Sequence, residues 1–314
     1  MSNQSTTSKQ NPAVSNGMNI IKHRKAFLTF SSLVILVAIA SLVVFGLRPG
    51  IDFTGGSIWQ IKFSENSVAK ADLADFLKDG LLLDQVSITE PSTGGFLIRS
   101  REMSELEHQD FLRRVGDNFG PTDELRFGSI GATIGKELSN KAIWAFIINL
   151  LAISAYIAYA FRKVSYPVSS WKYAATTLLT LFHDALIPVG LFALLGKFAG
   201  IEVDTNFIVA MLVVVGFSVH DTIVVFDRIR ENLRHSSVNK EGFATLVNRS
   251  INETIARSVN TSLTLIVVLV ALYLIGASTL NLFILAVLVG TIAGTYSSIF
   301  VASPLLVVWH GKSK

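Results

Sequence analysis

The chain has 314 residues, of which half are hydrophobic and 16% are charged, and its mean hydropathy is +0.50. That composition is too apolar for a water-soluble fold of this length. The chain has no cysteine, which excludes disulfides, thiol catalysis and thiolate metal sites. Its six histidines show no metal-ligand spacing, so we expect no metal site, no cofactor and no enzymatic activity.

Six apolar runs are each long enough to cross a bilayer core of about 30 Å as a helix, which takes about 20 residues. In lipid the backbone must satisfy its own hydrogen bonds, so these runs predict helices and not the shorter, alternating strands of a barrel. The runs cover residues 26–47, 142–161, 174–195, 206–226, 257–276 and 282–308. The first run has no cleavage site after it and predicts a retained anchor. Residues 1–25 form a basic tail whose first part is expected to be disordered.

The lysines and arginines of the short segments predict the orientation. Fourteen lie in the two terminal segments and the loops on the same side, whereas the short loops opposite hold only Lys197. Both termini of this multi-pass membrane protein are therefore expected in the cytoplasm, with residues 48–141 outside. This segment has 11 basic and 15 acidic residues, so the formal charge of +4 reflects a positive inner face and requires no nucleic-acid partner.

The segment 48–141 predicts a small soluble domain. Its periodicity changes in the order strand (57–63), helix (68–78), strand (85–90), strand (96–100), helix (102–119), strand (124–129). This βαββαβ order predicts an inserted α+β ferredoxin-like domain, a fold with many functions. In residues 227–256, Phe243, Leu246, Val247 and Ile251 share one helical face, which predicts either an amphipathic helix on the cytoplasmic surface or a helix packed on the bundle.

Ionisable groups inside membrane spans are costly and are functional candidates by default. Asp221 lies in the fourth run, about 8 Å from its inner end. Arg257 opens the fifth run on the same side and is either its ion-pair partner or an interfacial anchor. His183 and Asp184 in the third run, and His220 beside Asp221, are either parts of a proton relay or structural.

Small residues recur every four positions in the sixth run, including Gly290 and Gly294, and predict a close-packing stripe. Contact within the chain's own bundle is favoured over a dimer interface. Gly216 similarly permits close approach near Asp221.

Two motifs resemble the SecF branch of the SecD/SecF family of bacterial protein-export subunits. The first directly follows the first run and reads Gly50-Ile51-Asp52-Phe53-Thr54-Gly55-Gly56-Ser57. The second covers residues 216–232 and reads GFSVHDTIVVFDRIREN. The chain departs from the family where His220 replaces an asparagine, and where Gly131-Ala132 replaces Gly-Pro in an expected linker.

The resemblance implies a six-span inner-membrane partner of SecD, with residues 48–141 in the periplasm. It also implies an assembly similar to the resistance-nodulation-division transporters. Such proteins work beside the SecYEG channel, with YajC and YidC as further candidate partners, and use the proton motive force to export unfolded preproteins. It implies that Asp221 responds to protons, that Arg257 is its basic partner, and that Gly50, Asp52, Phe53, Gly55 and Gly56 form a joint to the outer domain. For the three glycines and Asp52, the alternative is a simple turn.

Two other functions stay open on the residues alone. One is half of a proton-driven small-molecule exporter of the same superfamily. The other is an intramembrane enzyme, for which the sequence offers no nucleophile or metal set, no P-loop and no nucleophile elbow.

Overall fold

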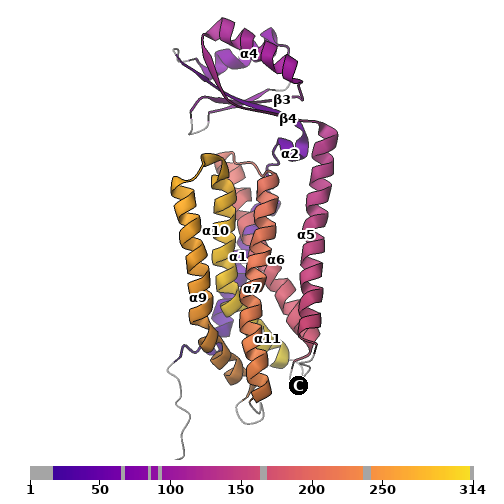
Figure 1. The fold of residues 1–314 in the computed structure, drawn as a ribbon, viewed down its shortest axis with the longest axis vertical. Coiled ribbons are helices and arrows are strands. Elements are labelled where there is room, and N and C mark those ends of the chain that lie inside the picture. Colours follow the sequence, from indigo (N-terminus) through magenta and orange to yellow (C-terminus); the bar gives the residue numbers. More distant parts are fainter. Residues whose placement is uncertain are drawn as a thin grey trace, which may run out of the picture.

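The computed structural model describes residues 17–64, 68–83, 86–90, 94–162, 168–235 and 242–311. It has two parts, a bundle of long helices and a small sheet domain at one end of the bundle (Figure 1). Most of the tail that was expected to be disordered, residues 1–16, lies outside the described residues, as do residues 163–167, 236–241 and 312–314.

Six helices in the described residues are long and apolar enough to cross a membrane, which confirms the predicted fold class. They are longer than the apolar runs, because polar residues beyond the apolar core continue the helical hydrogen-bond pattern. The spans are η1 (Ile21–His23) with α1 (Arg24–Phe45), α5 (Ala132–Ala160), α6 (Ser170–Ala199), α7 (Thr205–His235), α9 (Phe243–Ile275), and α10 (Asn281–Ser297) with η4 (Ser298–Ala302) and α11 (Ser303–Gly311).

The helices divide into an inner and an outer group. About half of the central stretches of α6 and α7 and 61% of that of the sixth span are buried, against 11% to 17% for α1, α5 and α9. The inner group is therefore α6, α7 and α10. The faces left open on α1, α5 and α9 are apolar and suit lipid or a partner's helices.

The sixth span is interrupted by the π-helical turn η4, which separates α10 from α11. Pro304 follows this turn and has no N–H to donate, so a regular helix cannot pass through it unchanged. The Ser303 hydroxyl donates to the carbonyl of Ser298 at 3.3 Å. This side chain adds a hydrogen bond across the π-helical turn.

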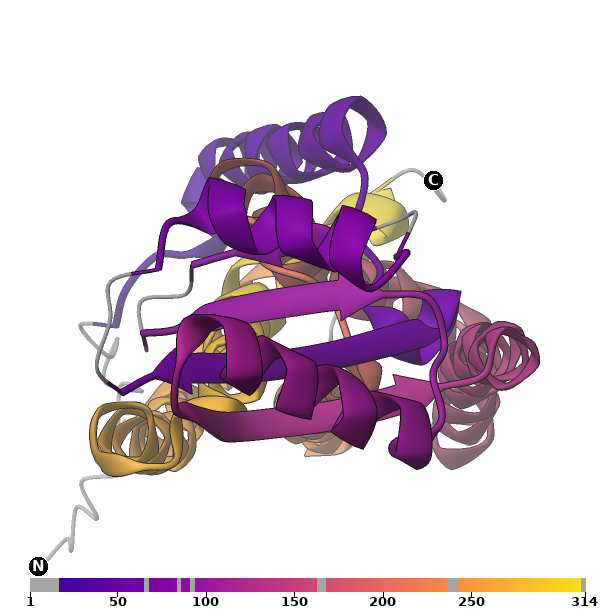
Figure 2. The same ribbon diagram turned by 90° about the horizontal axis from the view of Figure 1, so that it is seen from above.

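The sheet domain contains β1 (Gly56–Phe63), α3 (Lys70–Asp75) with the π-turn η2 (Phe76–Gly80), β2 (Ser87–Thr89), β3 (Phe96–Ser100), α4 (Glu105–Phe119) and β4 (Thr122–Ile130). The strands are ordered β2-β3-β1-β4 and pair antiparallel. This is the predicted ferredoxin-like arrangement. Both helices cover the sheet face that points away from the bundle (Figures 1 and 2).

The core of this domain lies between that sheet face and the two helices. Its largest buried side chain is Trp59, packed with Leu73, Leu77 and Ile98. Helix α4 starts at Glu105 and not at the predicted position 102, because Ser104 is its N-cap and accepts from the Glu107 N–H at 3.3 Å.

The predicted surface helix in residues 227–256 is wrong. Residues up to 235 continue α7, and α9 begins at Phe243 and runs without a break into the fifth span. The predicted apolar face exists, but Phe243, Leu246, Val247 and Ile251 are buried in a protein cluster with Phe161 and Phe226. A face buried in protein is not available to lipid, so the alternative of a helix packed on the bundle holds.

Candidate functional site

The first buried acid is Asp221 on α7, which is 1% exposed. The hydroxyl of Ser262, on α9, donates to its Oδ2 at 3.0 Å. Ser262 belongs to a row at helical spacing, Thr254, Ser258 and Ser262, that forms the buried polar face of α9. The fourth and fifth spans therefore meet through a carboxylate and a hydroxyl.

The second buried acid, Asp184 on α6, is fully buried, and its three hydrogen-bond partners lie on α10, α7 and α6 itself. The Ser297 hydroxyl of α10 donates to its Oδ2 at 2.7 Å. The Ser218 hydroxyl of α7 donates to the same oxygen, and the Nδ1 of His183 pairs with Oδ1 at 2.8 Å. Asp184 thus joins the three inner helices.

Ser218 and Asp221 are three residues apart on α7 and so lie on one face of that helix. The two acids therefore form a single polar layer across α6, α7, α9 and α10, which we call the acid layer: Asp184, Asp221, Ser218, Ser262 and Ser297. In the described part of the chain, no lysine or arginine forms an ion pair with either acid. A buried carboxylate is costly to keep ionised without a cation, and the hydrogen bonds of these two carboxylates join four helices, so the acid layer is the candidate functional site.

Arg257 and His220 lie outside the acid layer, and both side chains are exposed. Arg257 is five residues before Ser262, which places it about 140° away around α9. The predicted ion pair of Arg257 with Asp221 is therefore absent from this arrangement of the helices, where Ser262 occupies that position. His220 points away from the inner group, although Asp221 next to it is buried.

The predicted glycine stripe packs α10 on α7 within the chain. A Cβ on Gly290 would lie 2.2 Å from a methyl of Val214, and one on Gly294 would lie 3.0 Å from the Cβ of Ser218. Gly216 differs, because a Cβ there would have no atom within 4 Å. The prediction for Gly216 is wrong, since this glycine faces outward, away from Asp221 and α10.

The motif at residues 50–56 connects the sheet domain to the bundle. Gly50 donates from its N–H to the carbonyl of Val203 at 2.8 Å, and the N–H of Val203 donates to the carbonyl of Arg48 at 2.8 Å. A short helical turn, α2 (Ile51–Thr54), follows. Asp52 in this turn accepts from the N–H of Thr205 at 2.8 Å. Asp52 therefore accepts from the first N–H of α7, the helix that carries Asp221, in addition to the N-cap Asp204, which accepts from the Phe207 N–H at 2.9 Å.

Gly55 and Gly56 let the chain pass from α2 into β1. Gly55 has φ +74°, and a Cβ there would lie 2.5 Å from the Cα of Ala132, the first residue of α5. Gly56 has φ +111° and packs on the carbonyl of Ser100. Residues 131 and 132 are thus a packed junction and not the linker that was expected.

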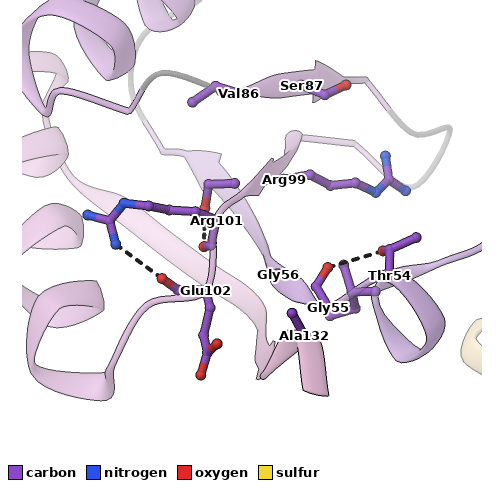
Figure 3. Close-up of a pocket in the computed structure, with 11 residues that line it drawn as sticks. Thr54, Gly55, Gly56, Val86, Ser87, Arg99, Arg101, Glu102 and Ala132 are labelled. Atoms are coloured by element: carbon purple, nitrogen blue, oxygen red, sulfur yellow. Dashed lines mark hydrogen bonds between the residues drawn. The ribbon is translucent and has the colours of Figure 1, made fainter. Parts of the chain in front are cut away.

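Beside these glycines lies a cavity of about 590 Å³, here called the motif pocket (Figure 3). Its lining includes Thr54, Gly55, Arg99, Glu102 and Ala132, so the motif, β3 and α5 all contribute. The pocket is an open, mixed-charge space at the joint of the two parts.

Arg99 at the end of β3 forms an ion pair with Glu202, in the loop between α6 and α7, at 2.8 Å. Burial raises the pKa of Glu202 above its ordinary value, and the nearby guanidinium groups of Arg99 and Arg48 partly offset this. The pair is a second link, besides Asp52, from the sheet domain to the outer end of α7.

Two family descriptions match the chain. Residues 112–312 match "Protein export membrane protein SecD/SecF, C-terminal", and residues 40–66 match the "SecD/SecF GG Motif". The chain belongs to the SecD/SecF family. The second match includes the joint at residues 50–56, and the first includes every residue of the acid layer.

Curated relatives of similar length are named protein translocase subunit SecF. The one from Thermobaculum terrenum is 42% identical over 94% of this chain and 95% of its own, and the one from Sebaldella termitidis is 38% identical over 92% and 91%. The protein translocase subunit SecDF of Thermus thermophilus is 36% identical over 89% of this chain but only 37% of its own. The chain thus corresponds to one part of a longer fused relative.

The crystal structure of SecDF from Thermus thermophilus, titled a translocon-associated membrane protein, has a TM-score of 0.78 and 34% identity over 96% of this chain and 40% of its own. SecDF in a super-membrane-facing form has a TM-score of 0.66 at 32% identity over the same shares. These relatives are named as protein translocase subunits, and the chain is accordingly an accessory subunit of the Sec translocase.

Ser218, Ser262 and Ser297 are the residues of the acid layer that the sequence analysis missed. A signal for them exists, because serine and threonine recur at helical spacing on the inner face of each helix involved. A hydroxyl in a membrane helix often bonds its own backbone, so spacing alone does not show which serine reaches an acid.

Proposed function

We propose that the chain acts with SecD as a SecF-type subunit that uses the proton motive force to promote translocation of unfolded preproteins across the inner membrane. The observation that carries this proposal is the acid layer, which joins four membrane helices through two carboxylates that have no lysine or arginine partner in the described residues. The fused SecDF relatives support SecD as the partner. SecYEG, YajC, YidC and the exported preprotein are proposed partners on family grounds.

The proposed orientation puts both termini in the cytoplasm and the sheet domain in the periplasm, on the strength of the lysine and arginine distribution. In this orientation the acid layer lies within the membrane. The motif at 50–56 lies at the periplasmic surface and contacts the outer end of α7.

Coupling follows from the position of α7. Protonation of Asp221 or Asp184 removes a negative charge, which weakens the hydrogen bonds from Ser262 and Ser218 and alters the packing of α7. The outer end of α7 is held by Asp52 and, through the preceding loop, by the ion pair of Arg99 with Glu202. Movement of α7 therefore reaches the sheet domain at two points. Arg257 is outside the acid layer, so it could pair with Asp221 during proton-driven transport only if α9 moved.

The energy available from one proton is limited. One charge crossing about 150 mV provides about 3.5 kcal/mol, whereas a shift of a two-state equilibrium from 1:99 to 99:1 takes about 5.5 kcal/mol. A second acid in the same layer removes this shortfall if both bind protons. We propose that Asp184 is that second acid.

The test is export of a secretory protein into inside-out vesicles that contain the full complex, with and without an imposed proton gradient. Asp221→Asn is expected to abolish the stimulation by the gradient while gradient-independent export continues. His220→Asn is the matched control, because it changes the neighbouring but exposed side chain. Normal stimulation with Asp221→Asn, in correctly assembled complex, would refute the proposal.

A further inference from the structure

The core of the sheet domain contains a histidine that has no part in the acid layer. His108 on α4 is 1% exposed. Its ring stacks on Phe127 of β4, with ring centroids 3.6 Å apart, and meets Trp59 of β1 edge-on at 5.7 Å. Neither ring nitrogen has a hydrogen-bond partner among the described protein groups. A neutral imidazole would therefore leave both of its polar nitrogens unsatisfied in a packed core, which is costly.

Two carboxylates approach these nitrogens. Nε2 lies 3.2 Å from Oε1 of Glu124 on β4, and Nδ1 lies 3.8 Å from Oε1 of Glu105, one turn earlier on α4. Within the described residues, neither glutamate forms an ion pair with a lysine or arginine. β1 faces the ring with the uncharged Trp59. The other residues one turn from His108 on α4 are uncharged: Ser104, Phe111 and Leu112. The charges that face the ring are therefore both negative.

A β-bulge brings Glu124 to this place. The register of β1 with β4 shifts after Gln60, so that Glu124 lies opposite Ile61 and Leu125 is an extra residue in β4. Ile61 is fully buried on the sheet face that the helices cover. Without the shift, the leucine would lie opposite Ile61 on that face. Instead Leu125 is 51% exposed, and the glutamate side chain, at 25% exposure, lies beside His108. The bulge thus replaces an apolar neighbour of the histidine with a carboxylate.

We infer that His108 is a proton-binding site of the sheet domain, and that its protonated ring fastens α4 to β4. Protonation gives Nε2 and Nδ1 the attraction of Glu124 and Glu105, which needs no hydrogen-bond direction, and the ring face of Phe127 also attracts a cation. Burial opposes the charge, and these three neighbours offset that cost. Histidine is the side chain that changes charge between pH 5 and 8, where both glutamates stay ionised.

The site is separate from the membrane spans but connected to one of them. β4 ends at Ile130, and α5 begins at Ala132, so the strand that the protonated ring holds continues directly into a membrane helix. The contact between α4 and β4 strengthens as the pH falls and weakens as it rises. The sheet domain therefore has a proton response of its own, beyond the function proposed for the acid layer.

NMR of the full chain in detergent, with carbon-13 in the histidine rings, measures this protonation between pH 8 and pH 5. The chain has six histidines, so five serve as internal controls, and the signal missing from His108→Gln identifies the sixth. We expect the His108 signal to titrate in this range. Glu124→Gln should move its midpoint to lower pH by about one unit or more, because an opposite charge at this distance is lost.

Asp123→Asn is the matched control. It removes the neighbouring carboxylate of β4, which accepts from the Ser64 hydroxyl at 3.2 Å and lies opposite Lys62 on the other sheet face. The midpoint of His108 should be nearly unchanged in this variant.

A second measurement needs no substitution of His108. With the three bundle tryptophans changed to phenylalanine (Trp144, Trp171 and Trp309), Trp59 is the sole tryptophan. A protonated imidazole quenches indole fluorescence on contact, so emission should fall with the pH, and Glu124→Gln should shift this change by the same amount. A ring that keeps one protonation state from pH 8 to 5, or a midpoint that Glu124→Gln leaves in place, would overturn the inference. Neither result would affect the proposed function of the acid layer, because neither measurement involves transport.

Discussion

The contact of Gly55 with the start of α5 can be tested by adding one methyl group. Gly55→Ala places a Cβ 2.5 Å from the Cα and 2.8 Å from the N of Ala132, which are backbone atoms and cannot rotate away. The expected cost has two parts, about 1–3 kcal/mol of backbone strain at φ +74° and about 1–3 kcal/mol of overpacking.

Gly46→Ala is the matched control. Gly46 has φ +67° and ψ 173°, close to the 74° and 175° of Gly55, but no atom lies within 4 Å of its Cβ position. It therefore incurs the strain without the overpacking. The gain from a stiffer unfolded chain is shared by both variants and cancels in the comparison.

Thermal unfolding of the purified protein in detergent measures the difference. At about 2.1 cal/mol/K of unfolding entropy per residue, 314 residues give roughly 1.5 °C per kcal/mol. An overpacking cost of about 1–3 kcal/mol should therefore lower the unfolding temperature of Gly55→Ala by roughly 1.5–5 °C relative to Gly46→Ala. Adding Ala132→Gly should restore little, because the closest contacts are to backbone. Equal unfolding temperatures for the two alanine variants would show that the motif does not pack on α5 as described.

Three further outcomes are expected. Gly290→Leu should destabilise the bundle, because even the Cβ of the new side chain would lie 2.2 Å from a methyl of Val214 on α7. Gly216→Leu should be tolerated, because no atom lies within 4 Å of its Cβ position. Wild-type thermal stability of Gly290→Leu would contradict the packing of α10 on α7. Asp52→Ala should cost about 1 kcal/mol of stability, because it removes the hydrogen bond from the first N–H of α7, and Asp52→Asn, which retains an acceptor, much less; equal losses would argue against this hydrogen bond. Burial raises the pKa of Glu202 above 4.5, so the folded state binds the proton of this carboxyl more tightly than the unfolded state does. The stability of the wild type relative to Glu202→Gln should therefore be highest below pH 4.5 and should fall as the pH rises through the raised pKa. A difference in unfolding temperature that stays constant or grows with pH would contradict this.

The fold could be predicted to a large extent because its signals are local. Apolar runs of bilayer length and the alternating periods of the inserted segment fix the helices and the ferredoxin-like order. The prediction was wrong where the apolar face of an amphipathic helix can pack either on lipid or on protein. Phe243 and Leu246 face protein and not lipid, and the pattern of apolar residues is the same in both cases.

The candidate site was less predictable, because it depends on rotation of each helix about its axis. Asp221 and Asp184 stand out in apolar sequence by their charge, but their serine partners lie on other helices. Arg257 illustrates the limit, since its depth suits an ion pair with Asp221 and only its angle around α9, about 140° from Ser262, rules it out in this arrangement.

The hydrogen bond that Asp52 accepts from α7 has a mechanical consequence. Thr205, which donates it, is 16 residues from Asp221, and a helix of that length spans about 24 Å. A continuous hydrogen-bonded helix changes little in length, so Thr205 and Asp221 lie on one segment of nearly constant length. An axial shift of α7 at the acid layer would therefore also change the contact between Thr205 and Asp52.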